Sequence, residues 1–150
     1  MESPENDPER RVAVDLFNHV WSLLEMDDRS PEQDDEMIHA AHASRHHWGR
    51  VGTALNAARG EWQISRVYSV LGRGEPALYH ARRCLALTTE HGFGDFDLAY
   101  AYEALARASA VAGDTHAAIR YAEQARVVTE DVEDNDDRDL VLADIATLPV

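Results

Sequence analysis

Three histidines in one segment have the spacing of a metal site. His39, His42 and His46 follow one another at intervals of three and four residues, which places their imidazoles on one face of a helix. Neutral imidazoles at i and i+4 can chelate a divalent metal such as zinc. The glutamate that follows the first histidine of a zinc-protease helix is missing here, which argues against a protease. The alternative is a polar stripe, or histidines packed between helices.

A second candidate site combines arginines with an aromatic ring. Arg59, Trp62 and Arg66 fall at i, i+3 and i+7 on one helical face. Arg107 follows Arg66 at a distance of 41 residues. Guanidinium forks beside aromatic rings suit a carboxylate or an extended acidic peptide. The alternative is that these arginines are solvated and paired within their own helices, while Trp62 covers a neighbouring helix.

The sequence offers little support for covalent catalysis. It has no Gly-x-Ser-x-Gly elbow, and its Gly-x-Gly pairs at 72–74 and 92–94 are typical of turns rather than of phosphate-binding loops. The single cysteine, Cys84, lies among apolar helix positions and is expected to be a small buried hydrophobe. We therefore expect a protein that is not an enzyme and uses no cofactor. The alternative is a divalent metal such as zinc on the histidine face, in a small-molecule- or metal-binding protein.

Charge is spread unevenly over the 150 residues. The net charge of −14 divides into −9 for residues 1–36, +4 for residues 37–94 and −9 for residues 95–150. Acidic flanks repel phosphates, which argues against nucleic acid as a partner, whereas the arginine-rich middle suits an anionic ligand. The sequence has no run of about 18 apolar residues and its N-terminus is acidic. We therefore expect no membrane span, no signal peptide and a cytoplasmic location.

Cap signals and apolar periodicity predict helices almost throughout the chain. Asp7-Pro8 and the capping box Ser30–Gln33 are typical helix starts, and Gly113-Asp114 is a typical stop followed by a cap. No strand-like alternation of apolar and polar residues is present. The predicted class is all-α. The expected helices cover about 8–26, 31–48, 53–71, 76–90, 95–112 and 114–129, and Asn135 is expected to cap a short last helix.

Two stretches of the chain echo each other. Gly72 is followed by small residues at 77, 81 and 84, and Gly113, 41 residues later, by small residues at 118, 122 and 125. Small residues at this spacing let two helices pack closely after a turn, which is typical of helical-hairpin arrays. Residues 58–130 resemble the tetratricopeptide repeat, whose standard unit of about 34 residues pairs two antiparallel helices. Longer helices and the loop 91–97 are expected to absorb the extra length.

The second unit fits this family best. Tyr102, Leu105 and Ala106 match its early aromatic residue and its leucine–small pair. The first unit departs from the pattern, because Glu61 occupies the early aromatic position and Trp62 stands beside it.

The resemblance implies an architecture and a binding surface. Antiparallel hairpins would stack as a short right-handed superhelix of about six to seven helices in a single domain, 1–150. A degenerate hairpin would cover 1–50, two repeat units 53–130, and an acidic segment with a capping helix 131–150. In this family the first helix of each unit lines a concave groove, which on this chain would be formed by Arg59, Trp62, Arg66, Ser69, Tyr100, Glu103 and Arg107.

This groove predicts a non-enzymatic module that binds a protein or peptide. Its arginines favour a partner that is acidic or carries a carboxylate. Because so short an array exposes apolar end faces, a homodimer is a further expectation.

Overall fold

The chain folds into helices joined by short turns. The computed structural model describes residues 7–150, which form seven α-helices and no strand, so the all-α prediction is confirmed for this part of the chain. None of these helices has the length and apolar character needed to cross a bilayer. The helices are α1 (Pro8–Leu24), α2 (Pro31–Val51), α3 (Ala54–Val70), α4 (Gly74–Glu90), α5 (Asp95–Val111), α6 (Thr115–Glu130) and α7 (Asn135–Ala146).

The predicted cap residues begin the first two helices. The Asp7 carboxylate accepts a hydrogen bond from the backbone N–H of Glu9 at 2.8 Å. Ser30 and Gln33 form both bonds of the predicted capping box. These bonds satisfy backbone donors that have no partner inside the helix, so the start of each helix is encoded locally.

Several boundaries differ from the predicted ones by one to three residues, and three of these differences have a clear local cause. Helix α4 begins at Gly74, so Pro76 is its third residue, at a position where a missing N–H costs nothing. Helix α2 continues through Gly49 to residue 51, because a single interior glycine costs only about 1 kcal/mol. Helix α7 is capped by Asp134, whose side chain accepts from the backbone N–H three residues on at 2.9 Å, and Asn135 is its first residue.

The two glycine turns of the sequence echo have the same backbone geometry. Gly72 and Gly113 have φ of +75° and +87°, the left-handed region that glycine adopts without a steric penalty. In each turn the glycine N–H donates to the carbonyl three residues back at 3.1 Å. The next N–H donates to the carbonyl five residues back at 2.9 Å. The repetition in the sequence is therefore also a repetition in structure.

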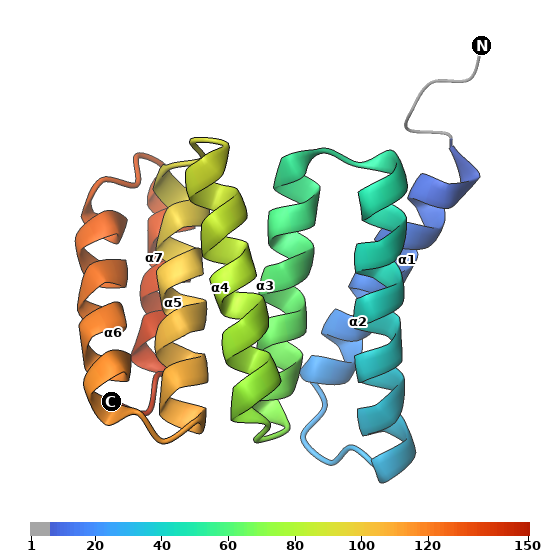
Figure 1. The fold of residues 1–150 in the computed structure, drawn as a ribbon, viewed down its shortest axis with the longest axis horizontal. Helices are drawn as coiled ribbons and strands as arrows, with labels where there is room; N and C mark the ends of the chain where they lie inside the picture. The colour runs from blue at the N-terminus through green and yellow to red at the C-terminus, as the bar shows by residue number, and fades with distance from the viewer. Residues whose placement is uncertain (1–6) are drawn as a thin grey trace.

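Consecutive helices pack as hairpins, and the odd-numbered helices also contact one another (Figure 1). Helix α3 contacts α1 and α5 in addition to α2 and α4, and α5 contacts α7. In the view of Figure 1, α1 passes behind α2, and α7 lies behind α5 and α6. One side of the molecule is thus formed by α1, α3, α5 and α7, and this side carries the candidate site.

The small residues of the echo lie in the core. All six are buried, with at most 3% of any of them exposed: Ala77, Ala81, Cys84, Ala118, Ala122 and Ala125. Gly74 takes part in the same close packing. A Cβ added at this position would lie only 2.6 Å from the Cα of Ala112, so no larger residue fits without a shift of the backbone. The start of α4 and the end of α5 therefore touch backbone to backbone.

Candidate functional site

The odd-numbered helices surround a pocket of about 430 Å³, which we call the aromatic pocket. Helices α1, α3, α5 and α7 form most of its wall, and α4 contributes two residues. Its lining is mainly apolar and aromatic. The residues are Phe17, Trp21, Glu25, Ala58, Arg59, Trp62, Cys84, Thr88, Phe96, Asp97, Tyr100, Leu140 and Asp144.

Four aromatic rings form a continuous series along this wall. The ring centroids of Trp21 and Trp62 are 5.5 Å apart, those of Trp62 and Tyr100 5.4 Å, and those of Tyr100 and Phe96 4.9 Å. Separations of about 4.5–7 Å are favourable for aromatic pairs. The series joins α1, α3 and α5, so the pocket has an aromatic wall built from three helices.

The predicted groove residues divide between this pocket and a closed hollow beside it. Arg59, Trp62 and Tyr100 line the aromatic pocket. Trp62 also borders the hollow, which has no room for a ligand and is lined in addition by Arg66, Ser69, Glu103 and Arg107. The seven residues are therefore neighbours in space, but only three of them face an open volume.

Glu103 is the centre of an ion-pair network in the closed hollow. Its side chain is fully buried, and its Oε1 lies 3.4 Å from an Nη of Arg66 and 2.8 Å from Nε of Arg107. Its Oε2 accepts a hydrogen bond from Nε1 of Trp62 at 3.3 Å. A buried carboxylate needs such partners to offset its loss of hydration. Glu103 thus binds two arginines that the sequence predicted as ligands for a partner.

Helix α7 extends this network to the wall of the aromatic pocket. The Asp144 carboxylate lies 3.5 Å from an Nη of Arg66 and accepts a hydrogen bond from the hydroxyl of Tyr100. Burial and this carboxylate raise the pKa of Tyr100, so the phenol remains a neutral donor. Arg107 donates to the carbonyl oxygen of Asp144 at 3.1 Å and to Oγ1 of Thr147 at 2.8 Å. The C-terminal helix and its C-cap residue therefore supply further acceptors to the arginine pair.

Arg59 is also paired, at the wall of the aromatic pocket. Its Nε donates to Oδ1 of Asp97 at 3.0 Å and its Nη2 to Oδ2 at 3.2 Å, a bidentate contact between α3 and α5. The Arg59 side chain remains 49% exposed. It is the one cationic side chain among the residues that line the pocket, which also include three carboxylates, those of Glu25, Asp97 and Asp144.

Reasoning from the sequence missed the contributions of α1 and α7 to this pocket. Phe17 and Trp21 lie four residues apart on α1, and this spacing does not show which helix they would face. Leu140 and Asp144 lie in α7, whose apolar residues do not form a single stripe. Both helices lie outside the two repeat units, and no local signal connects them with the pocket.

The predicted histidine face has a different environment. His39, His42 and His46 are all exposed on α2, and among residues 7–150 no group of three or more His, Cys, Asp or Glu side chains is placed to hold a metal ion. His42 instead hydrogen-bonds the hydroxyl of Tyr68 through Nε2 at 2.9 Å. Its ring lies 5.4 Å, centroid to centroid, from that of His80 on α4.

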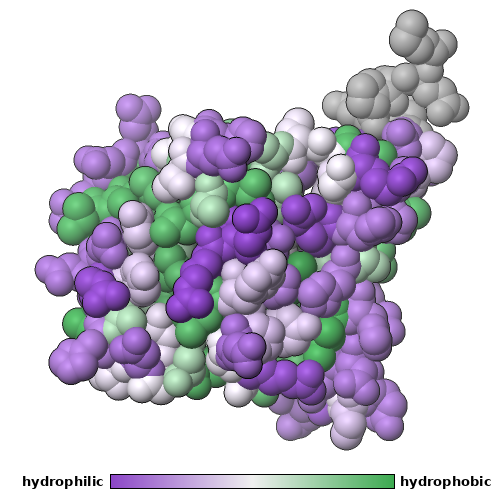
Figure 2. Space-filling view, in the orientation of Figure 1, coloured by the Kyte–Doolittle hydropathy of each residue, from purple (hydrophilic) through white to green (hydrophobic). Residues whose placement is uncertain are grey.

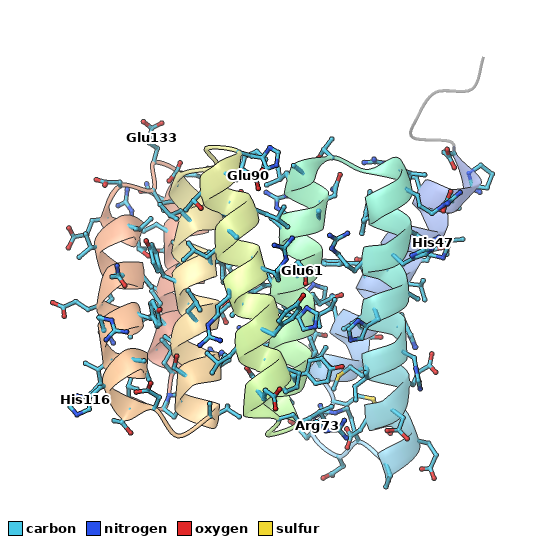
Figure 3. The ribbon with its side chains drawn as sticks, in the orientation of Figure 1. His47, Glu61, Arg73, Glu90, His116 and Glu133 are labelled. Atoms are coloured by element: carbon cyan, nitrogen blue, oxygen red, sulfur yellow. The ribbon has the colours of Figure 1, made fainter. Side chains whose placement is uncertain are left out.

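Glu61 is the polar centre of this second region. Figure 3 shows Glu61 on α3, between α2 and α4. Its Oε2 lies 2.6 Å from Nδ1 of His80, and its Oε1 accepts from Nε of Arg45 at 3.4 Å. Gly60 makes room for this contact, because a Cβ there would lie 2.9 Å from Cδ of Arg45. This glycine inside α3 therefore has a packing role.

Two side chains of this region have pKa values below their ordinary ones. The pKa of His42 is lowered, first by partial burial and then by the nearby His80 and His39, while Glu61 acts in the opposite direction. The pKa of Glu61 is also lowered, since its contacts with His80 and Arg45 outweigh the effect of burial. The cluster links α2, α3 and α4 through polar contacts.

The two sides of the molecule differ in character. Figure 2 shows mostly hydrophilic residues on the side turned to the viewer, where α2 and α4 lie in front. The aromatic pocket is on the side formed by the odd-numbered helices. Its volume and its mainly apolar, aromatic lining are typical of a ligand-binding site.

No family model, curated protein or solved structure matches this chain, so its resemblance to the tetratricopeptide repeat stays a prediction.

Proposed function

We propose that the protein is a non-enzymatic binding module that holds a segment of another protein against the side formed by α1, α3, α5 and α7. The observation that carries the proposal is the aromatic pocket, which would accept a bulky apolar side chain of that segment. Its volume of about 430 Å³ falls within the range of about 300–1,000 Å³ that is usual for binding pockets.

A tetratricopeptide-like superhelix is part of this proposal. It is supported by the matching turns at Gly72 and Gly113 and by the contacts of α3 with α1 and α5 and of α5 with α7. In such an array the first helices of successive units line one continuous surface. That surface would present the pocket to an extended or helical peptide.

The internal ion pairs of the arginines affect which kind of partner can bind. Arg66 and Arg107 bind Glu103, and Arg59 binds Asp97. An acidic partner would have to compete with these internal carboxylates. The apolar wall is available without such competition, so we place the main binding energy in the aromatic pocket and its residues Trp21, Trp62 and Tyr100.

The one thiol of the chain favours binding over covalent catalysis. Cys84 lines the pocket but is only 3% exposed, and burial raises its pKa to about 12. A nucleophilic cysteine needs a lowered pKa and access to its substrate.

A peptide-library selection tests the proposal. Peptides selected on the protein are expected to share a bulky apolar residue, and their binding is then measured by the fluorescence of Trp21 and Trp62 in a Trp48→Phe background. Trp48 does not line the pocket, so its removal leaves the two tryptophans of the pocket as reporters.

Helix α7 offers a matched pair of variants for this measurement. Leu140 is 53% exposed and lines the pocket, whereas Leu142 is 44% exposed and does not. Leu140→Asn is expected to weaken binding about tenfold, roughly the effect of losing 1–2 kcal/mol of apolar contact, and Leu142→Asn to leave it unchanged. Equal effects of the two substitutions, or selected peptides without an apolar residue in common, would contradict the proposal.

A further inference from the structure

We infer that the segment held by the aromatic pocket is basic, with a lysine or arginine close to its apolar anchor. This inference rests on the proposed function and specifies the chemistry of the partner. It departs from the acidic partner that the arginine spacing predicts in the sequence. Three observations on the structure lead to it.

The first observation is the charge of the pocket wall. Three carboxylates line the pocket, those of Glu25, Asp97 and Asp144, against the single guanidinium of Arg59. Arg59 uses both Nε and Nη2 on Asp97. Glu25 is exposed at the end of α1, where it can meet a charge on the partner. Asp144 is in turn paired with Arg66, so the negative charge left without an ion pair among the described lining residues is that of Glu25, which is accessible from solvent.

The second observation is the charge of helix α7. It carries four aspartates against the single Arg138, a net charge of −3, whereas α1 carries two acids and two arginines and is neutral. Helix α7 also begins with exposed acidic side chains, Asp136 and Asp137. A surface lined by one sign of charge attracts ligands of the opposite sign and raises their rate of association. The field at the pocket favours a cationic segment.

The third observation is the aromatic series itself. The faces of aromatic rings attract cations and repel anions, because the ring quadrupole is negative above the plane. The structure already contains one such contact, with the guanidinium carbon of Arg66 5.5 Å from the ring centre of Trp62. A lysine or arginine of the partner would meet both the rings and the nearby carboxylates.

Three short blocked peptides test the inference. They share one central phenylalanine and differ only in its neighbours, which are lysine, glutamine or glutamate. Binding is followed by the fluorescence of Trp21 and Trp62 in the Trp48→Phe background, at low salt and at high salt. The lysine peptide is expected to bind about tenfold more tightly than the glutamine peptide, and the glutamate peptide most weakly. Added salt should reduce the differences in affinity among the three peptides, because it screens exposed charges.

Two substitutions that change the net charge by the same amount separate the effect of the pocket's own carboxylate from that of the protein's overall electrostatic field. Glu25→Gln removes a carboxylate of the pocket, whereas Glu133→Gln removes an exposed one that does not line it (Figure 3). The preference for lysine over glutamine is expected to fall about threefold in Glu25→Gln and to remain in Glu133→Gln.

The outcomes separate this inference from the proposed function. Equal binding of the three peptides, or tightest binding of the glutamate peptide, overturns the inference and leaves an apolar pocket in place. If none of the peptides binds, the pocket does not accept an apolar side chain and both proposals fail. A preference for lysine that is the same in Glu25→Gln and in the unaltered pocket also overturns the inference, because the charge would then be recognised elsewhere.

Discussion

Nε1 of Trp62 donates a hydrogen bond to Oε2 of Glu103 across a sequence separation of 41 residues. This is also the separation of Gly72 from Gly113 and of Arg66 from Arg107. Both arginines bind the other carboxylate oxygen of Glu103. Residues at equivalent positions of the two units thus meet at one buried carboxylate, which joins α3 to α5.

Substitution of Glu103 by glutamine is expected to destabilise the fold. The carboxylate is fully buried, and the two arginine side chains that it binds are only 15% and 13% exposed. Removing one partner of a buried ion pair leaves uncompensated charge and costs about 3–5 kcal/mol. We expect a loss near the lower end of that range, because both arginines keep some access to water. Urea unfolding measures it.

The control for this measurement is Glu123→Gln on α6. Glu123 is exposed, so its substitution is expected to change the free energy of unfolding by no more than about 0.5 kcal/mol. If Glu103→Gln has as small an effect as the control, the network around Glu103 does not stabilise the fold.

Alanine at Gly113 is expected to lower stability by about 1–2 kcal/mol. The residue has φ of +87°, which an alanine Cβ disfavours, although no atom lies within 4 Å of the added carbon. Gly72→Ala, at φ of +75°, should lose a similar amount. Gly94→Ala is the control, since Gly94 also has open space but no positive φ. A loss in Gly94→Ala equal to that in Gly113→Ala would rule out backbone conformation as the cause.

Alanine at Gly74 is expected to be destabilising for a different reason. The added Cβ would meet the Cα of Ala112 at 2.6 Å, and backbone cannot move aside as a flexible side chain does. Overpacking of this kind costs about 1–3 kcal/mol. Thermal unfolding followed by circular dichroism measures the loss. An unchanged Tm would mean that α4 and α5 are not in such close contact.

Stability is expected to depend on pH through His42. Because the pKa of His42 is lowered in the folded protein, the folded state binds its proton less readily than the unfolded chain. The contribution of neutral His42 is therefore complete above the ordinary pKa of about 6.5 and is lost as the pH falls from there through the lowered pKa. Urea unfolding at about pH 7.5 and about pH 5.5 should show a smaller difference in His42→Gln than in the unaltered protein.

His116→Gln serves as the control for this pH dependence. His116 is exposed on α6, away from the cluster around Glu61 (Figure 3). This variant should keep the full difference between the two pH values. The lowered pKa of Glu61 acts in a separate window, since its contribution is lost only as the pH falls below its ordinary value of 4.5. Equal pH dependence in the two histidine variants would contradict the assignment to His42.

The thiol of Cys84 is expected to be almost unreactive in the folded protein. Burial raises its pKa from 9.0 to about 12, which reduces the thiolate fraction near pH 8 about a thousandfold. Reaction with an aromatic disulfide reagent should therefore be at least about a thousandfold slower in the folded state than in urea. Because the chain has one cysteine, the absorbance change reports on Cys84 alone. Rapid stoichiometric labelling of the folded protein would show that the thiol is accessible from the pocket.

Much of the fold could be predicted because its signals are local. Asp7 and Ser30 bond backbone groups two or three residues away, and a positive φ at Gly72 or Gly113 is needed whatever surrounds the turn. Such signals predicted the helices to within a few residues. Two of the departures, at Pro76 and Asn135, concern residues that a first turn accepts equally well inside or just outside the helix.

The candidate site could be predicted only in part. The spacing of Arg66 and Arg107 indicated that the two side chains belong together, and they do share one region. It did not indicate that Glu103 and Asp144 would neutralise them, because ion pairing depends on which side chains approach within about 4 Å. Arg59 is likewise bound to Asp97 of another helix.

The sequence by itself determined where the helices begin, turn and end, because capping bonds and backbone conformation involve only near neighbours along the chain. The tertiary structure decided which surface is open to a partner. It placed Trp21 of α1 and Leu140 of α7 around one pocket and buried Glu103 between two arginines. These outcomes depend on how helices distant in sequence pack and on how much solvent remains between them, and no local pattern of residues encodes either quantity.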